Sequence, residues 1–218
     1  MTTEIFDQAL TILEKEARGW DVPIVTLISN RSNDPFQVLV STMLSLRTKD
    51  EVTAAACRRL FVRAATAEEM VTLTKAELIE LVYPVGFYKT KAENILKTCR
   101  LIIEKHGGRV PGDIDTLLTF PGVGRKTANL VRTLGYGKPG ICVDTHVHRI
   151  TNRRGYVRSS SPDETEKKLR RKLPSEWWIP VNDILVAFGQ ALCRPISPFC
   201  SRCSVAALCE KRGVGRSR

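Results

Sequence analysis

Hydrophobic residues recur at helical spacing along almost the whole chain. In the stretch EIFDQALTILEKEA, for example, Ile5, Leu10, Ile12 and Leu13 fall near one helix face. Further segments with the helical period are 34–47, 51–64, 75–82, 90–108, 113–120, 161–173 and 178–193. Alternating patterns of the kind that strands require are short and rare. The sequence therefore predicts an all-α protein of about ten helices joined by short loops.

A turn with two glycines stands between two of these predicted helices. The stretch TFPGVGRKTANLV places Gly122 and Gly124 directly before Arg125 and Lys126, and a helix is predicted to start near Arg125. Together with the helical segment 113–120, this arrangement predicts a helix–hairpin–helix unit. Glycine lets the main chain approach a ligand closely, and the N–H groups at a helix N-terminus bind anions such as phosphate.

The two cations behind the turn need an explanation, because a helix N-terminus already carries partial positive charge. A phosphate bound there would make Arg125 and Lys126 favourable. A nucleotide-binding P-loop is excluded, since Arg125 separates Gly124 from Lys126 and the preceding segment is helical instead of a strand. A plain glycine turn with two exposed cations remains the alternative interpretation of the hairpin taken alone.

The charge balance favours a polyanion as the partner. The chain has 218 residues, with 34 Lys and Arg against 23 Asp and Glu, and a net charge of +11. A domain this basic commonly binds nucleic acid or an anionic membrane surface. No run approaches the roughly 18 apolar residues of a membrane span, and the start, MTTEIFDQAL, lacks the pattern of a secretory signal. We therefore expect an intracellular, cytoplasmic protein.

Four of the seven cysteines are crowded near the C-terminus. They follow the pattern C-x6-C-x2-C-x5-C, at Cys193, Cys200, Cys203 and Cys209. Four thiolates this close in an intracellular protein are typical of a zinc or an iron–sulfur site, and the chemistry alone leaves both open. Zinc sites more often pair two C-x2-C units, whereas this pattern contains one, so the spacing favours a [4Fe–4S] cluster. The other three cysteines are expected to be core thiols in apolar helices: Cys57, Cys99 and Cys142.

The stretch ICVDTHVHRITNRRG contains an acid and two histidines. Asp144 is well placed to cap the helix that begins there, which is the simplest interpretation of an Asp-Thr pair at that point. His146 and His148 diverge at a spacing of two residues on a helix, so a metal site at these histidines is not expected.

Five motifs in this order resemble the endonuclease III family of DNA glycosylases, within the helix–hairpin–helix glycosylase superfamily. They are LSLRTKD (44–50), VGFYKTKAENILKTCR (85–100), FPGVGRKTANLV (120–131), VDTHVHRITNR (143–153) and the four-cysteine pattern. The resemblance covers nearly the whole chain. It implies a two-lobed all-α fold with DNA between the lobes. One lobe would be a six-helix domain over 25–137, and the other a cluster-bearing domain formed by 1–24 and 138–218.

The resemblance also implies an activity and two catalytic residues. The protein would be a monomeric, nucleoid-associated DNA glycosylase and AP lyase of base excision repair. It would remove oxidised pyrimidines from duplex DNA and cleave the abasic site by β-elimination. Lys126 would be the nucleophile that forms a Schiff base, and Asp144 its acidic partner. A helix N-terminus and the adjacent Arg125 both favour the neutral amine that such an attack requires.

Further residues would contact the DNA. Gly122, Gly124 and Arg125 would bind phosphates irrespective of base sequence. Arg47 stands where other members usually carry a glutamine, in the loop that fills the gap left by an extruded base, so the preference for the opposite base is expected to change. Phe87 matches the second, apolar wedge of the family. Phosphate contact by Arg47 and simple core packing of Phe87 are the competing interpretations.

Two other classes of function remain open at this point. A thymine- or adenine-mismatch glycosylase shares the superfamily, although the adenine branch generally lacks the hairpin lysine. A non-catalytic DNA-binding module with a structural metal would need neither Lys126 nor Asp144. The terminal stretch KRGVGRSR is expected to be a disordered basic tail.

Overall fold

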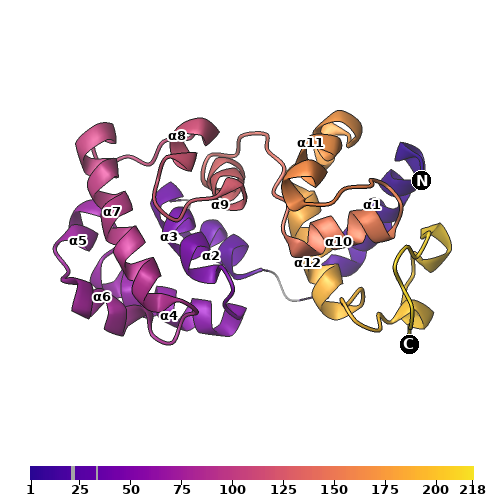
Figure 1. Ribbon diagram of the computed structural model, residues 1–218, viewed down its shortest axis with the longest axis horizontal. Coiled ribbons are helices and arrows are strands. Elements are labelled where there is room, and N and C mark those ends of the chain that lie inside the picture. The colour runs from indigo at the N-terminus through magenta and orange to yellow at the C-terminus, as the bar shows by residue number, and fades with distance from the viewer. Residues whose placement is uncertain (21–22, 33) are drawn as a thin grey trace. The chain divides into compact units, whose positions relative to one another are not determined.

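The computed structural model describes residues 1–20, 23–32 and 34–218. These residues form twelve α-helices, together with short 3-10 and π-helical turns, and no strand (Figure 1). The helices are α1 (Thr3–Ala17), α2 (Ile24–Ser32), α3 (Pro35–Ser45), α4 (Asp50–Arg63), α5 (Ala67–Val71), α6 (Lys75–Val82), α7 (Tyr88–His106), α8 (Ile114–Leu118), α9 (Arg125–Leu130), α10 (Thr145–Arg153), α11 (Pro162–Lys172) and α12 (Pro180–Ala191). The prediction of an all-α protein is confirmed. None of these helices is long and apolar enough to cross a lipid bilayer.

The chain divides into two compact units. One contains Met1–Pro23 and Pro139–Arg218, and the other contains Ile24–Lys138. The predicted N-terminal segment 1–24 includes positions 21 and 22, which lie outside the described residues. That the two units act as the functional domains predicted above stays a prediction.

Local sequence signals account for most helix starts and for the end of α7. Thr66 and Thr74 each form a capping box with the glutamate three residues later, which starts α5 and α6. Ser161 caps α11, with Pro162 in its first position. Gly107, with φ of 58°, ends α7 in the left-handed conformation that glycine adopts readily. Helices α2 and α5 were absent from the sequence prediction. Helix α2 buries only Val25, Thr26 and Ser29, and α5 only Ala67 and Met70, so neither has an extended apolar face for periodicity to reveal.

Each unit has its own hydrophobic core. In the unit of residues 24–138, α3 is buried at Phe36 and from Val38 to Leu44, and it contacts α2, α4, α7 and α9. In the other unit, α12 contacts α1 and α10. The three cysteines predicted to be core thiols are all buried: Cys57, Cys99 and Cys142. Burial raises the pKa of Cys57 and of Cys99 to about 12, so both stay protonated at neutral pH.

Candidate functional site

The glycine hairpin joins α8 to α9 and is fixed to the core by its apolar residues. Phe120 and Val123 are 3% and 7% exposed. The Val123 N–H donates to the Phe120 carbonyl oxygen at 3.1 Å, which closes the turn. From α7, Thr98 Oγ1 donates to the Pro121 carbonyl oxygen at 3.3 Å. The hairpin is therefore a rigid support for the residues that follow it.

Glycine is found at the two hairpin positions for different structural reasons. Gly122 has a φ of 77°, and a Cβ there would lie 2.8 Å from Nδ2 of Asn94 on α7. Gly124 has a φ of −100° and a ψ of 179°, and no atom lies within 4 Å of the place its Cβ would take. Gly122 is thus required by the fold. Gly124 is not, and the open space beside it admits a ligand close to the main chain.

Replacing each glycine by alanine should separate stability from binding. Gly122→Ala is expected to lower the free energy of unfolding by about 1–3 kcal/mol, because alanine is strained at a positive φ. Gly124→Ala is expected to change it by less than about 0.5 kcal/mol and to weaken binding to duplex DNA. Thermal unfolding and a DNA titration would measure the two effects. Equal DNA affinity of Gly124→Ala and the unchanged protein would exclude a close main-chain contact at Gly124.

Arg125 and Lys126 occupy the first turn of α9, and both are half-buried. The helix continues without a break into a π-helical turn over Val131–Gly135. Such turns are rare and often occur near functional sites. The cations predicted from the sequence thus stand at the start of a helical run that extends to residue 135.

Asp144 caps α10, as the simplest interpretation of the sequence required. Its Oδ1 accepts hydrogen bonds from the N–H groups of His146 and Val147 at 2.8 and 2.9 Å, and the residue is 8% exposed. A cap does not exclude a catalytic role, which stays a prediction for this carboxylate. Lys126 belongs to the unit of residues 24–138 and Asp144 to the other unit.

The structure brings Arg47 and Phe87 together, although they are distant in sequence. The guanidinium carbon of Arg47 lies 5.7 Å from the centre of the Phe87 ring. Phe87 is 63% exposed, which excludes core packing as its role. Both residues adopt a positive φ, of 53° and 58°. Non-glycine residues rarely do so, and such strain is concentrated at functional sites.

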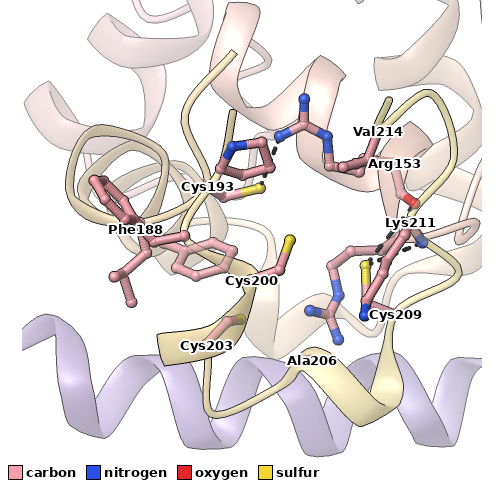
Figure 2. Close-up of a pocket in the computed structure, with 13 residues that line it drawn as sticks. Arg153, Phe188, Cys193, Cys200, Cys203, Ala206, Cys209, Lys211 and Val214 are labelled. Carbon is pink, nitrogen blue, oxygen red and sulfur yellow. Dashed lines mark hydrogen bonds between the residues drawn. The ribbon is translucent and has the colours of Figure 1, made fainter. Parts of the chain in front are cut away.

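The four clustered cysteines line one pocket in the unit that contains residues 139–218 (Figure 2). Cys193 follows α12, while Cys200, Cys203 and Cys209 lie on the loops and short 3-10 turns beyond it. As they stand, no three His, Cys, Asp or Glu side chains among the described residues are placed to hold a single metal ion. Burial raises the pKa of Cys193 and of Cys203, and the nearby arginines act against this shift.

Two arginines at the end of α10 face these cysteines, and the sequence analysis missed both. Arg153 is 7% exposed and its Nη1 donates to Cys193 Sγ at 3.2 Å and to the Arg194 carbonyl oxygen at 2.8 Å. Arg154 is 1% exposed and donates to the Leu208 carbonyl oxygen at 3.1 Å. Within the described part of the chain its Nε has no hydrogen-bond partner. A buried guanidinium without a carboxylate requires some other negative charge nearby.

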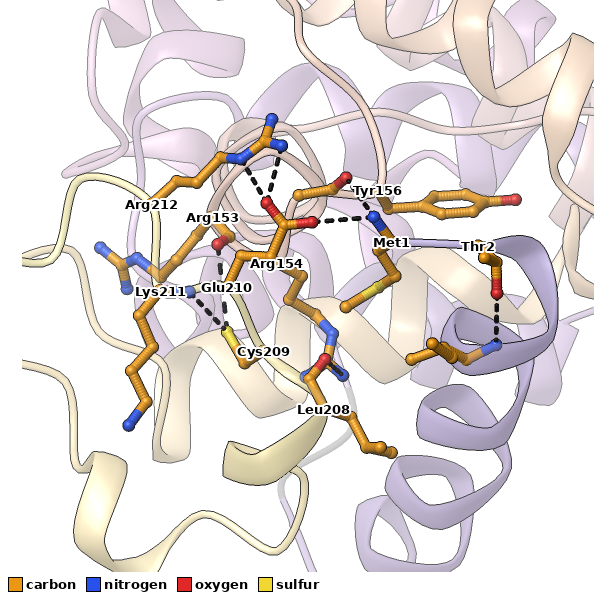
Figure 3. A network of polar contacts seen from close by, with 12 residues as sticks. Met1, Thr2, Arg153, Arg154, Tyr156, Leu208, Cys209, Glu210, Lys211 and Arg212 are labelled. Carbon is orange, nitrogen blue, oxygen red and sulfur yellow. Dashed lines mark hydrogen bonds and ion pairs between the residues drawn. The ribbon is translucent and has the colours of Figure 1, made fainter.

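The C-terminal segment folds back over the cysteine loop, so the prediction of a disordered tail is wrong. The Arg218 N–H donates to the Pro198 carbonyl oxygen at 2.8 Å, and the Arg218 carbonyl accepts from the Ser201 N–H at 2.9 Å. Figure 3 shows a network at the start of this segment, where Glu210 bonds Arg212 and the amine of Met1. Main-chain hydrogen bonds, which composition does not reveal, hold the segment in place.

Comparisons with known proteins agree with this arrangement. Residues 40–175 match the family described as HhH-GPD superfamily base excision DNA repair protein. Endonuclease III of Thermotoga maritima is 45% identical over 193 residues, covering 87% of this chain and 91% of that protein. Two solved structures, a non-covalent endonuclease III–DNA complex and a trapped endonuclease III–DNA covalent intermediate, are 33% identical with TM-scores of 0.87. Both matches cover 97% of this chain. They cover 96% of the protein chain in the non-covalent complex and 97% of the chain in the trapped intermediate.

Proposed function

This chain belongs to the endonuclease III family of helix–hairpin–helix base excision DNA repair proteins, and we propose that Lys126 and Asp144 carry its reaction. The protein is a DNA glycosylase and AP lyase whose partner is duplex DNA with a damaged base or an abasic site. We propose oxidised pyrimidines as its lesions and the cytoplasm, in association with the DNA, as its location.

Lys126 acts as the nucleophile in this proposal. Its amine bonds to C1′ of the sugar while the bond from C1′ to the base breaks, and the base leaves with a proton. Opening of the sugar ring gives a Schiff base, which acidifies the C2′ proton, so that loss of this proton expels the 3′ phosphate. The observation that carries the proposal is the place of Lys126, in the first turn of α9 on a hairpin fixed by buried Phe120 and Val123.

Asp144 stabilises the positive charge that develops on the sugar as the base departs. Its carboxylate is nearly buried, and two main-chain N–H groups fix its orientation. A carboxylate held in this way needs no reorientation when the charge appears.

Asp144→Asn tests this role without removing the helix cap. Asparagine caps helices about as well as aspartate, so the free energy of unfolding should change by less than about 0.5 kcal/mol. Base excision under single-turnover conditions should slow on the order of 100-fold, since the negative charge is lost. Asp144→Ala would lose the cap as well, at about 1 kcal/mol. An asparagine variant of undiminished excision rate would show that Asp144 is only a cap.

We propose that Cys193, Cys200, Cys203 and Cys209 hold a [4Fe–4S] cluster. The donor set fits, because four thiols surround one pocket and each thiolate of such a cluster binds a different iron. The bonds to sulfur fit as well: Arg153 donates to Cys193, and the Lys211 N–H lies 3.4 Å from Cys209 Sγ. Buried Arg154 balances the negative charge of a thiolate-bound cluster. When bound, the cluster supplies a cross-link between the terminal loops.

A duplex containing a single thymine glycol tests the proposed function. We expect release of the base and scission of the strand by β-elimination in the same reaction. Base release only from a thymine or adenine mismatch would point to a mismatch glycosylase. Binding without either reaction would show a DNA-binding module with a structural metal.

A further inference from the structure

Lys91 on α7 is a buried lysine that the proposed reaction does not use. It is 8% exposed, and its Nζ donates to the carbonyl oxygens of Leu44 at 2.8 Å and Leu46 at 2.5 Å. A third bond, of 3.2 Å, joins Nζ to Thr48 Oγ1. An ammonium group has three donors, so each of its protons finds an acceptor. These acceptors lie on both sides of Arg47, and Lys91 therefore fixes the backbone from which Arg47 projects.

The same helix fixes Phe87. Helix α7 begins at the next residue, and the Lys91 N–H donates to the Phe87 carbonyl oxygen at 3.0 Å. The Gly86 N–H donates to Thr48 Oγ1 at 3.1 Å. A Cβ on Gly86 would lie 2.6 Å from the Arg47 carbonyl oxygen, so only glycine allows the two segments to approach this closely. Lys91 and Thr48 thus join the segments that carry Arg47 and Phe87.

We propose that Lys91 is a positioning residue for extrusion of the damaged base, because it holds Arg47 and Phe87 as one rigid unit that enters the duplex. This inference rests on the proposed function and deepens it. Extrusion costs a few kcal/mol of lost stacking and pairing, and side chains that fill the vacated space offset this cost. Such side chains must be held in place before the DNA arrives, since ordering them on binding would consume the gain.

A role in stability alone does not explain a lysine at this position. Burial lowers the pKa of Lys91 to about 8, because the charged amine has lost most of its water. That desolvation cost opposes the gain from its three hydrogen bonds, and an apolar side chain of similar length would avoid it. Unlike an apolar side chain, the lysine can donate hydrogen bonds to three oxygens of the 44–48 segment at once.

Helix α7 also supports the catalytic hairpin from the same face. Lys91, Asn94 and Thr98 follow the i, i+3, i+7 spacing of one helix face. Asn94 lies beneath Gly122, and Thr98 bonds Pro121. One rigid helix therefore sets the positions of both the hairpin that carries Lys126 and the pair that is proposed to open the duplex.

The test compares Lys91→Met with Lys89→Met. Lys89 is exposed on the same helix, so its substitution removes the same charge without touching the 44–48 segment. Two rates are measured: single-turnover excision of thymine glycol paired with adenine in a duplex, and cleavage of an abasic site in single-stranded DNA. The single strand has no opposite base and no closed stack to open. Thermal unfolding is measured alongside.

We expect Lys91→Met to slow duplex excision on the order of 10- to 100-fold while single-strand cleavage changes less than about two-fold. In an Arg47→Ala, Phe87→Ala background, Lys91→Met should add no further loss, since the side chains it positions are gone. Lys89→Met should change the two rates by the same factor. Equal losses of both rates in Lys91→Met, or no loss of either, would overturn the inference.

Thr48 provides a second, independent pair of variants if Lys91→Met fails to fold. Thr48→Val keeps the shape of the side chain and removes the oxygen shared by Lys91 and Gly86, whereas Thr48→Ser keeps that oxygen. Thr48→Val should slow duplex excision without slowing single-strand cleavage. Thr48→Ser should keep both rates of the unsubstituted protein. Identical behaviour of the two variants would overturn the inference. If the unchanged protein cleaves neither substrate, the proposed function itself fails, and this inference with it.

Discussion

Lys126→Gln is expected to abolish the covalent adduct that borohydride traps between this protein and DNA containing an abasic site. Borohydride reduces a Schiff base to a stable amine, and glutamine has no nucleophilic nitrogen with which to form one. Strand scission should fall by about 1,000-fold or more, as for the loss of other catalytic nucleophiles. Gel electrophoresis of the trapped complex and of the cleaved strand measures both effects.

Arg125→Gln is the matched control, because it removes the neighbouring cation from the same turn of α9 and leaves the amine of Lys126 in place. This variant should bind DNA more weakly, so that its complex with DNA dissociates at a lower salt concentration, yet it should still form the adduct. An adduct of undiminished yield in Lys126→Gln would show that another amine is the nucleophile.

Cys203→Ala is expected to prevent assembly of the proposed iron–sulfur cluster and to unfold the loops that surround its pocket. The segment from Cys193 onward contains only short 3-10 turns, and it contributes few apolar side chains to the core of its unit, Val205 and Leu208 among them. Loss of a structural metal centre belongs to the small class of changes that cost more than about 4 kcal/mol. Iron analysis, visible absorption and thermal unfolding would each report the loss.

Cys142→Ala serves as the control for the cluster. Cys142 is buried in the same unit, 2% exposed, outside the cysteine pocket. Its substitution should leave the iron content and the visible absorption unchanged. If the protein without substitutions is colourless and contains one zinc per chain, the proposed cluster is contradicted and a structural zinc site is supported instead.

Several features of this protein were determined by the sequence itself, because they depend on residues close together in the chain. The long amphipathic helices follow from hydrophobic period, and their ends from caps such as Thr74 and Gly107. The hairpin follows from two glycines before a helix. The burial of Cys57, Cys99 and Cys142 follows from their apolar neighbours.

Other features were decided only by the tertiary structure, because they join residues that are far apart in the chain. The ammonium of Lys91 meets Leu44 across 47 positions, and Arg153 meets the sulfur of Cys193 across 40. Nothing local marks either cation as buried, since lysine and arginine usually stand at a surface. A buried cation requires oxygen or sulfur acceptors from other segments, and only the packed chain supplies them.

The same reasoning applies to one prediction that the folded chain contradicts and to one alternative that it excludes. The basic composition of residues 211–218 predicted disorder, but the main chain of Arg218 bonds Pro198 and Ser201. For Phe87 the sequence left a choice between core and surface, and the fold exposes the ring beneath Arg47. Composition and period determine which segments become helices and which residues have the chemistry. The contacts between distant segments decide which of those residues are buried, positioned and brought together.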